Sequence, residues 1–459
     1  MVHKLDFDPG LIKKYDKSGP RYTSYPTAPQ FSTEYTADTL KSCIERSNRE
    51  IIPAPLSLYI HIPYCDTICY YCACNKIITK NHTVSNEYLD LLEAEMQMIS
   101  PLFDKDRELE QLHLGGGTPT FLNDEELMDL IRRIEDNFTF AKDCEMSIEI
   151  DPRKVSNETL ELLTNIGFNR ISLGVQDFDE KVQLAVNRVQ SYELVRDRLE
   201  TCRRLNIKSI NMDLIYGLPF QSVETFERTL DKVIELRPDR LSIFNYAHLP
   251  ERFKPQRRIN DEDLPTPAEK LKILELTMNK LQEAGYVYIG MDHFALEDDS
   301  MVKAQQEGSL QRNFQGYSTH AHTDLVAIGV SSIGSIFDSY SQNSSNIDDY
   351  REMVLAGKLP IVRGLVMNND DLLRKQVINQ LICHFDLEIT KFEEQWNIDF
   401  KEYFKSEMKQ LDLMVEDGLV KVDEKSIKVE TRGRLLIRNI CMVFDNYLKD
   451  NVVKFSKVI

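Results

Sequence analysis

The sequence has no apolar run long enough to cross a lipid bilayer, and its first residues, MVHKLDFDPGLIKK, lack the apolar core of a signal peptide. These absences predict a protein of the reducing cytoplasm. Positive charge is also scarce, because 56 Lys and Arg stand against 74 Asp and Glu and give a formal net charge of −18. That excess of acid argues against non-specific binding to nucleic acid or to anionic membranes.

Cysteine is sparse except in one segment. The chain has nine cysteines in 459 residues, and four of them lie in CDTICYYCAC, residues 65–74. Disulfide frameworks belong to short secreted domains, and an odd number of cysteines in a long chain argues against one. A four-cysteine zinc site usually needs a second C-x2-C pair after a longer loop, which the sequence does not supply. We expect the other five cysteines to be buried apolar side chains.

Cys65, Cys69 and Cys72 have the spacing C-x3-C-x2-C. Three thiolates on one loop can hold three irons of a 4Fe–4S cubane and leave the fourth iron open. An open iron suits a small molecule that binds the metal and receives an electron. Cys74 breaks this three-ligand pattern, and it is either a spare thiol or a residue close to the chemistry.

A glycine-rich segment, GGGTPT at residues 115–120, closes a predicted strand. No Gly-Lys-Ser/Thr follows it, and the G-x-G-x-x-G spacing of dinucleotide sites is missing. Because glycine has no side chain, the backbone here can approach a ligand closely. We expect this loop to hold the polar end of a small ligand beside the cysteine loop, the alternative being a tight turn without a ligand.

Predicted strands alternate with predicted helices through the middle of the chain. The strands are expected at 56–62, 109–116, 145–151, 170–176, 209–217 and 240–247, with a further strand at 286–295. Helices are expected between them, for example at 86–99, 124–138 and 223–236. This alternation predicts an α/β fold with a parallel sheet, in the form of a partial (β/α)6 TIM-type barrel.

Polar residues end four of these predicted strands, namely Glu149, Gln176, Asp213 and Asn245. Barrel enzymes place their active sites at the carboxyl ends of their strands. Each residue alone could be an ordinary loop hydrogen-bonding group, but four at equivalent places predict a site.

Three domains are expected along the chain. Residues 1–35 form an N-terminal arm, residues 36–364 the catalytic barrel, and residues 365–459 a mostly helical, winged-helix-like C-terminal domain. DNA binding is not expected of this last domain, because it holds 15 basic and 17 acidic side chains.

The cysteine and glycine motifs resemble those of the radical S-adenosylmethionine (SAM) superfamily. Longer segments, including KYDKSGPRYTSYPTA, CYYCACNK, QLHLGGGTPTFL, NMDLIYGLP and RNFQGYSTH, are similar to the oxygen-independent coproporphyrinogen III oxidase family, from about residue 11 to the C-terminus. The resemblance implies that a reduced 4Fe–4S cluster cleaves SAM to a 5′-deoxyadenosyl radical, which takes hydrogen from a propionate side chain. Loss of CO2 and one electron then leaves a vinyl group. Two such reactions convert coproporphyrinogen III to protoporphyrinogen IX in haem biosynthesis.

The same resemblance implies roles for individual residues. The implied cluster ligands are Cys65, Cys69 and Cys72. The implied contacts of a first SAM are Tyr59, Tyr71, Gly116, Glu149 and Ile333. The implied contacts of a second SAM are Gly117, Thr118, Gln176, Arg188, Asp213 and Ala247. The implied catalytic residues are Tyr59, Glu149, Phe314 and Gln315.

A substrate with four carboxylates needs local cations on so acidic a chain. The N-terminal arm has five Lys or Arg against three Asp and one Glu, and we expect Arg21 and Tyr22 to bind the substrate. The alternative is an arm that only straps the barrel. His320 and His322 are interpreted as solvated loop side chains rather than metal ligands.

We expect a monomer that uses an electron donor and an acceptor which the sequence does not identify. A haem-binding chaperone and a radical SAM methylase are the alternative functions. Cys74, the intact segment 18–27 and the full-length C-terminal domain favour the oxidase over the chaperone.

Overall fold

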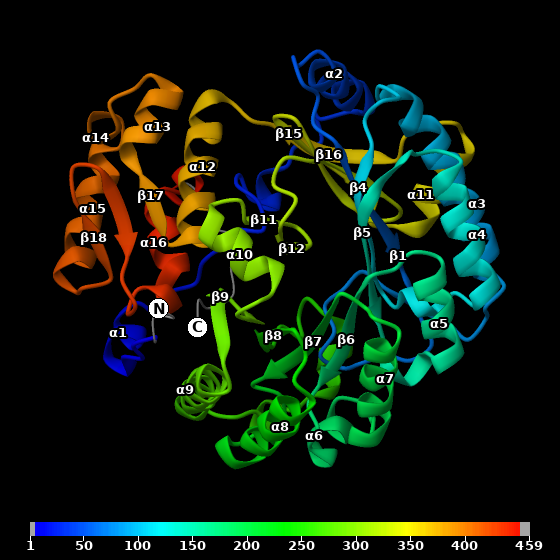
Figure 1. The fold of residues 1–459 in the computed structure, drawn as a ribbon, viewed down its shortest axis with the longest axis horizontal. Coiled ribbons are helices and arrows are strands. Elements are labelled where there is room, and N and C mark those ends of the chain that lie inside the picture. Colours follow the sequence, from blue (N-terminus) through cyan, green and yellow to red (C-terminus); the bar gives the residue numbers. More distant parts are fainter. Residues whose placement is uncertain (1–4, 450–459) are drawn as a thin grey trace. The chain divides into compact units, whose positions relative to one another are not determined.

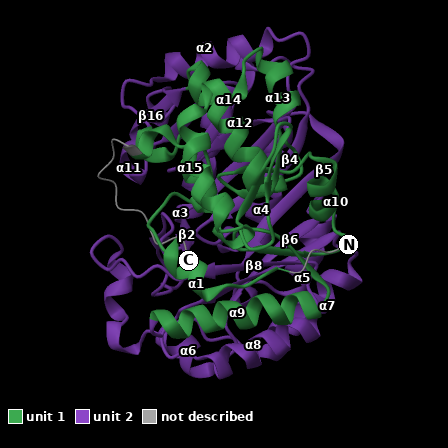
Figure 2. Ribbon diagram, turned by 90° about the vertical axis from the view of Figure 1, so that its left-hand side faces the viewer, with its two compact units in different colours: residues 1–30, 267–321, 367–459 green, residues 31–266, 322–366 purple. Residues whose placement is uncertain are grey.

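The structure is a computed structural model that describes residues 5–449. These residues group into two compact units (Figure 2): unit 1 holds residues 5–30, 267–321 and 367–449, and unit 2 holds residues 31–266 and 322–366. The chain passes from unit 1 to unit 2 at 30/31 and from unit 2 to unit 1 at 366/367. Both positions are close to the domain boundaries expected at 35/36 and 364/365. Residues 267–321, expected within the barrel domain, group with unit 1. The three-domain division itself stays a prediction.

Unit 2 is built on a large, mostly parallel sheet (Figure 1), with the strand order β16-β15-β14-β13-β1-β4-β5-β6-β7-β8. The parallel strands are β13 (Asp324–Ile328), β1 (Leu56–Ile62), β4 (Leu109–Gly116), β5 (Phe140–Ile150), β6 (Arg170–Gln176), β7 (Ser209–Tyr216) and β8 (Arg240–Asn245). The antiparallel strands are β14 (Ile333–Ile336), β15 (Ser339–Asn343) and β16 (Ile361–Val366). The six strands expected between residues 56 and 247 are therefore confirmed.

Helices cover this sheet and connect its parallel strands. They are α2 (Ala37–Asn48), α3 (Val84–Ile99), α4 (Asp124–Glu135), α5 (Asn157–Asn165), α6 (Glu180–Ala185), α7 (Tyr192–Arg204), α8 (Val223–Leu236) and α11 (Ile347–Leu355). Local sequence fixes where several of them begin. Asn123 and Glu126 form a capping box at α4, as Ser222 and Thr225 do at α8, and each box satisfies backbone N–H groups of the first turn.

The strands are apolar because both faces of a parallel sheet are covered. In β1, Leu58, Ile60 and Ile62 are fully buried, and Leu112 and Leu114 of β4 are buried beside them. Tyr59 is paired in register with His113, which is paired with Ser147 of β5. The carboxyl ends of these strands therefore lie next to one another, and polar side chains near those ends are brought together.

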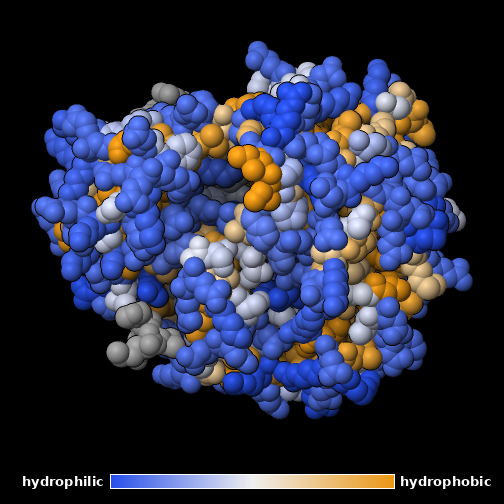
Figure 3. Space-filling model, turned by 45° about the horizontal axis from the view of Figure 1, so that its top comes forward, coloured by the Kyte–Doolittle hydropathy of each residue, from blue (hydrophilic) through white to orange (hydrophobic). Residues whose placement is uncertain are grey.

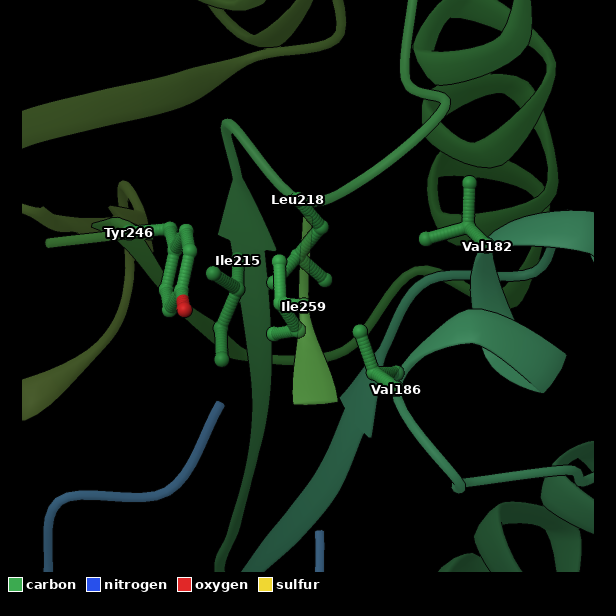
Figure 4. Packing of buried hydrophobic residues seen from close by; sticks show 6 residues of the cluster. All are labelled: Val182, Val186, Ile215, Leu218, Tyr246 and Ile259. Carbon is green, nitrogen blue, oxygen red and sulfur yellow. The ribbon is translucent and has the colours of Figure 1, made fainter. Parts of the chain in front are cut away.

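A hydrophobic cluster lies near the ends of β7 and β8. It contains Val182, Val186, Ile215, Leu218, Tyr246 and Ile259, and Figure 4 shows these side chains gathered around the end of a strand. Tyr70 and Tyr71 of the cysteine segment pack against the cluster. The cysteine loop therefore rests on apolar packing.

Unit 1 contains an arm helix, a hairpin region and a mostly helical C-terminal part. Its helices are α1 (Pro9–Lys14), α9 (Pro267–Glu283), α10 (Ser300–Glu307), α12 (Asn369–His384), α13 (Ile389–Trp396), α14 (Phe400–Tyr403), α15 (Lys405–Glu416) and α16 (Ile437–Val443). Its strands are β9 (Tyr286–Gly290), β10 (His293–Leu296), β11 (Gln311–Asn313), β12 (Gly316–Ser318), β17 (Asp386–Glu388), β18 (Val420–Val422) and β19 (Ser426–Val429).

One sequence-based expectation for unit 1 was wrong. The single strand expected at 286–295 is an antiparallel hairpin of β9 and β10. Gly290 has φ 146° and Met291 has φ 54°, so the backbone turns in the left-handed region between the two strands. In the C-terminal part, β18 and β19 form an antiparallel hairpin.

Hydrophilic residues predominate on the face drawn in Figure 3, with hydrophobic residues scattered among them. Within residues 5–449, no helix combines the length and the apolar character that a membrane crossing requires.

Candidate functional site

The cysteine loop begins where β1 ends. A short parallel pair, β2 (Tyr64–Cys65) and β3 (Ile77–Ile78), closes its base. The backbone N–H of Thr118 donates to Tyr64 O at 2.9 Å, and that of Gly117 donates to Ile62 O at 2.7 Å. The glycine-rich loop and the start of the cysteine loop are thus hydrogen-bonded to each other, as the sequence led us to expect.

The far side of the cysteine loop is held by two other segments. The N–H of Tyr70 donates to Val186 O at 3.0 Å, and the side-chain amide of Asn187 donates to Ile68 O at 2.7 Å. Gln256, which is buried, donates through Nε2 to Tyr71 O at 3.0 Å. The loop is therefore fixed on both sides of Cys69.

The thiols of this loop are free rather than paired in disulfides. Cys65 and Cys69 are buried, whereas Cys74 is exposed. The hydrogen bond from Cys74, together with the charge of Lys76, lowers the pKa of the Cys72 thiol to about 6 although burial opposes it. Burial raises the pKa of the Cys65 thiol to about 11. Cys72 is therefore the more readily available thiolate, the form that binds metal.

This donor set fits an iron–sulfur cubane, because three of the thiols on one loop have the C-x3-C-x2-C spacing. Across residues 5–449, no three His, Cys, Asp or Glu side chains converge as they would on a single ion. A cubane takes one thiolate at each of its ligated irons, so its three ligands have to be spread over one loop. Cys65, Cys69 and Cys72 meet that requirement.

Close packing within the protein, as well as the approach of a ligand, favours glycine at the three positions 115–117. A Cβ on Gly117 would lie 2.6 Å from Pro63 O, and one on Gly116, whose φ is 114°, would lie 2.7 Å from the His61 ring. A Cβ on Gly115 would lie 3.2 Å from the Glu149 carboxylate. Glycine is thus needed at 116 and 117 for β4 to pack against the entry of the cysteine loop.

A second cluster of polar side chains lies around Glu149. The Glu149 carboxylate accepts a hydrogen bond from Gly116 N at 3.2 Å, and His113 Nε2 lies 3.5 Å from its Oε1. His113 stacks on the Tyr59 ring at 5.8 Å between centroids, and the Tyr59 hydroxyl is 3.1 Å from His61 Nδ1. Desolvation works to raise the pKa of Glu149, but His113 and Gly116 outweigh it, and the pKa lies below its ordinary value.

Asp213 of β7 lies at the same edge of the sheet. Its oxygens accept hydrogen bonds from Ser172 at 2.9 Å and from Asn211 at 2.8 Å. Burial and the nearby charge of Glu149 raise the pKa of Asp213 to about 6. Two carboxyl groups thus share this edge, one favoured as the anion and one that takes up a proton more easily.

Arg188 is buried and lies between three groups. Its Nε and NH2 donate to Gly174 O at 3.2 and 2.6 Å, and its NH1 lies 3.3 Å from Asp151 Oδ2 and 3.5 Å from Cys69 Sγ. The family resemblance implied that this guanidinium contacts a second SAM. In the structure it already bonds to Asp151 and to the cysteine loop, and its role toward SAM stays a prediction.

Unit 2 thus brings most of the predicted site residues to one edge of its sheet. Those at or beside the carboxyl ends of the parallel strands are Tyr59, Cys65, Cys69, Tyr71, Cys72, Gly116, Gly117, Thr118, Glu149, Gln176, Arg188, Asp213 and Ala247. Ile333 begins β14. Sequence reasoning missed His61 and His113. His61 lies in the predicted strand at 56–62 and His113 in the segment QLHLGGGTPTFL, so position within these segments was the available signal.

Four predicted residues belong to unit 1. Arg21 pairs with Asp292 at 3.2 Å, and Tyr22 is buried, with its hydroxyl donating to Asp445 at 2.9 Å. Phe314 and Gln315 form the tip of the β11–β12 hairpin. Within the described part of the chain, Gln315 Nε2 is buried without a hydrogen-bond partner, which suits a residue that contacts a ligand.

Two family models match this chain. Residues 59–233 match the Radical SAM superfamily, and residues 367–436 match the HemN C-terminal domain.

Full-length relatives are also similar. Oxygen-independent coproporphyrinogen III oxidase from Pseudomonas aeruginosa is 52% identical over 100% of both chains, and the Escherichia coli protein of that description is 48% identical over 100% of both chains. Among solved structures, coproporphyrinogen III oxidase (HemN) from Escherichia coli matches with a TM-score of 0.92 and 47% identity, over 97% of this chain and 100% of that one. Together with the thiol loop, the glycine-rich loop and Glu149 at one edge of a parallel sheet, this similarity shows that the chain belongs to the oxygen-independent coproporphyrinogen III oxidase family of the radical SAM superfamily.

Proposed function

We propose that this chain oxidatively decarboxylates two propionate side chains of coproporphyrinogen III without oxygen and releases protoporphyrinogen IX for haem biosynthesis. The family membership supports the reaction. The observation that carries it is local: the cysteine loop is hydrogen-bonded to the glycine-rich loop, and Glu149 accepts a hydrogen bond from that same glycine-rich loop. One edge of the sheet can thus bind a cluster and a small ligand side by side.

Cys65, Cys69 and Cys72 would hold a 4Fe–4S cluster at this edge. The bound cluster and SAM supply one-electron cleavage of SAM, which yields a carbon radical able to take hydrogen from a propionate. The loop itself keeps the ligands in place through the bonds of Tyr70 and Tyr71 to the surrounding segments. Arg188 offsets negative charge at Cys69, because its guanidinium lies beside that sulfur.

Glu149 and the backbone N–H groups of the glycine-rich loop suit the ammonium and carboxylate ends of a first SAM. The lowered pKa keeps Glu149 anionic and able to accept from an ammonium group. Tyr59, Tyr71, Gly116 and Ile333 complete this proposed set.

We extend the proposal to a second SAM near the ends of β6 and β7. Its proposed contacts are Gly117, Thr118, Gln176, Arg188, Asp213 and Ala247. Asp213 can accept from ribose hydroxyls, since its oxygens already accept from Ser172 and Asn211.

Arg21 and Gln315 are proposed to contact the substrate. Arg21 is positively charged, and the buried side-chain amide nitrogen of Gln315 has no hydrogen-bond partner in the described residues. Tyr22 is 3% exposed, so it would have to leave Asp445 to cover a macrocycle. That burial favours the alternative in which Tyr22 has a structural role in the arm and does not bind the substrate.

Finer features of the architecture and setting complete the proposal. Strands β1 and β4 to β8 form a partial (β/α)6 barrel, with residues 1–35 as an arm and 365–459 as a winged-helix-like domain. The protein acts as a monomer in the reducing cytoplasm, which is in keeping with nine free cysteines. An electron donor and an acceptor serve each turnover.

The test is an anaerobic turnover assay with reconstituted protein, coproporphyrinogen III, SAM and dithionite, with products separated by mass. We expect loss of two CO2 and gain of two vinyl groups, and Cys69→Ala as control should give neither. Methylated porphyrin would indicate a methylase. Tight haem binding without vinyl products would indicate a chaperone. Either result would refute the proposal.

A further inference from the structure

A basic segment lies on the surface beside the cysteine loop. Arg252, Lys254, Arg257 and Arg258 fall within seven residues, and all four are exposed. No carboxylate of the described chain forms an ion pair with any of them. Arg257 Nε instead donates to Pro250 O at 3.0 Å, and Arg252 lies over the Phe253 ring. Four cations within seven residues, none of them in an ion pair among the described residues, stand out on a chain with a net charge of −18.

The segment is anchored directly to the loop that carries the cysteines. Arg258 lies 5.2 Å from the centre of the Tyr70 ring, and its NH1 is 3.4 Å from the Tyr70 hydroxyl. Gln256, in the short 3-10 helix Lys254–Arg258, donates through Nε2 to Tyr71 O at 3.0 Å. Tyr70 and Tyr71 stand between Cys69 and Cys72 in the chain. The basic segment therefore contacts the proposed cluster loop through Arg258 and Gln256.

An apolar side chain and a further cation flank the same loop. Leu184 is 61% exposed and comes just before Val186 and Asn187, which bond to Tyr70 and Ile68. Lys181 lies 3.9 Å from the centre of the Phe220 ring, and Phe220 packs on the hydrophobic cluster that includes Ile259. Acidic residues flank the segment, because Glu251 precedes Arg252 and Asp261, Glu262 and Asp263 follow. In the described part of the chain none of them pairs with the four cations, and Asp261 contacts His248 at 2.9 Å instead.

We propose that these residues form the docking surface of an acidic one-electron carrier protein that reduces the cluster. The inference rests on the proposed function, which requires one electron for each SAM that is cleaved. In the docked complex the reduced carrier gives up one electron and the cluster site gains it, with no bond made or broken. Opposite charges at an interface raise the association rate and select the partner, and a carrier rich in carboxylates is the complement of this segment.

The charge argument favours a protein carrier over the substrate as the occupant. The four cations are exposed within residues 252–258, whereas the residues proposed to contact SAM lie at or beside the strand ends. A protein partner can span the separate cations and the exposed Leu184 at once. Such transient electron-transfer contacts are typically small, polar at the rim and sensitive to salt.

The experiment compares two double variants that change the charge equally. Arg252→Glu/Arg257→Glu alters the surface without touching the cysteine loop. Lys142→Glu/Lys208→Glu alters exposed lysines at the opposite, amino-terminal ends of β5 and β7. Reduced flavodoxin, an acidic flavoprotein, is the carrier probe, and dithionite is the reductant that needs no docking. Turnover and the Kd for flavodoxin, by calorimetry at low and physiological ionic strength, are both measured.

We expect the arginine variant to weaken flavodoxin binding and to raise the KM for flavodoxin by roughly tenfold, with less dependence on salt. Its dithionite-driven turnover should match that of the unaltered protein, and the lysine variant should behave normally with both reductants. If both variants lost flavodoxin affinity equally, the effect would be a general one of charge, and the inference would be overturned. A higher KM for coproporphyrinogen III under dithionite would mean a substrate site and would overturn it too. If the unaltered protein fails to turn over with dithionite, the proposed function fails, and the Kd comparison still decides the docking surface.

Discussion

His113 connects the glycine-rich strand to Glu149: its Nε2 lies 3.5 Å from Glu149 Oε1, while its Nδ1 lies 2.6 Å from the Ser147 hydroxyl. The ring is held from both sides, because it also stacks on Tyr59. This arrangement keeps the pKa of Glu149 below its ordinary value although the surroundings desolvate the carboxylate. His113 is therefore a positioning residue for the proposed SAM site.

Replacing His113 by phenylalanine should keep the stack on Tyr59 and remove the support for the Glu149 carboxylate. The pKa of Glu149 then rises, so protonation begins at higher pH and SAM binding is lost sooner as the pH falls. We expect SAM affinity to fall about tenfold at mildly acidic pH and less at alkaline pH. Equilibrium binding of SAM across pH measures this. His322→Phe removes a histidine from a surface pair with Glu110 and serves as the control; an unshifted profile for His113→Phe would contradict the assignment.

Glu95 of α3 should make stability depend on pH. It is buried, accepts from Gly329 N at 2.9 Å and from Asn343 and Tyr350, and burial raises its pKa to about 7. Because the folded pKa lies above the ordinary value of about 4.5, ionisation is disfavoured in the folded state. Stability is therefore lost as pH rises through roughly 4.5 to 7, by roughly 3 kcal/mol if the full shift applies.

The Glu95→Gln variant tests this because glutamine does not titrate. Urea unfolding midpoints of the cofactor-free protein should fall between about pH 5 and 7 for the unaltered chain and stay flatter for the variant. Glu125→Gln, an exposed change in α4, should keep the slope of the unaltered chain. Parallel slopes for the unaltered chain and Glu95→Gln would show that Glu95 does not titrate in this range.

Cys74 should be dispensable for cluster binding. It is exposed, whereas Cys65 and Cys69 are buried and Cys72 is partly buried. We expect Cys74→Ala to keep the full iron content, and Cys65→Ala, Cys69→Ala and Cys72→Ala to lose it. Iron and sulfide per chain after anaerobic reconstitution measure this. Equal iron loss in Cys74→Ala and Cys69→Ala would make Cys74 a ligand.

Gly117→Ala should disturb the cysteine loop more than Gly115→Ala. A Cβ at 117 meets the backbone oxygen of Pro63 at 2.6 Å, and backbone moves less readily than a side chain. We expect Gly117→Ala to bind less iron. Gly115→Ala, whose Cβ meets the Glu149 carboxylate at 3.2 Å, should bind iron normally and bind SAM more weakly. The two variants control each other, and normal iron content in Gly117→Ala would contradict the close packing.

The sequence predicted six of the parallel strands because their apolar runs are long and four of them end in a polar residue, whereas the short strand β13 (Asp324–Ile328) was missed. It also indicated which strand ends carry Glu149 and Asp213, since strand order along the chain is strand order in this part of the sheet. The hairpin at 286–296 was missed because its turn depends on positive φ at Gly290 and Met291, which the apolar pattern hides. The bonds of Arg188 to Asp151 and Cys69 were also unpredictable, because they join segments far apart in sequence.

The most direct measurement uses coproporphyrinogen III deuterated at the β-carbons of its propionates, with reconstituted protein, SAM and dithionite under anaerobic conditions. The proposed reaction predicts deuterium in the 5′-deoxyadenosine that is released, together with a porphyrinogen that has lost two CO2 and gained two vinyl groups. Cys69→Ala should give neither. Release of 5′-deoxyadenosine without deuterium, with the porphyrinogen unchanged, would contradict the proposed function.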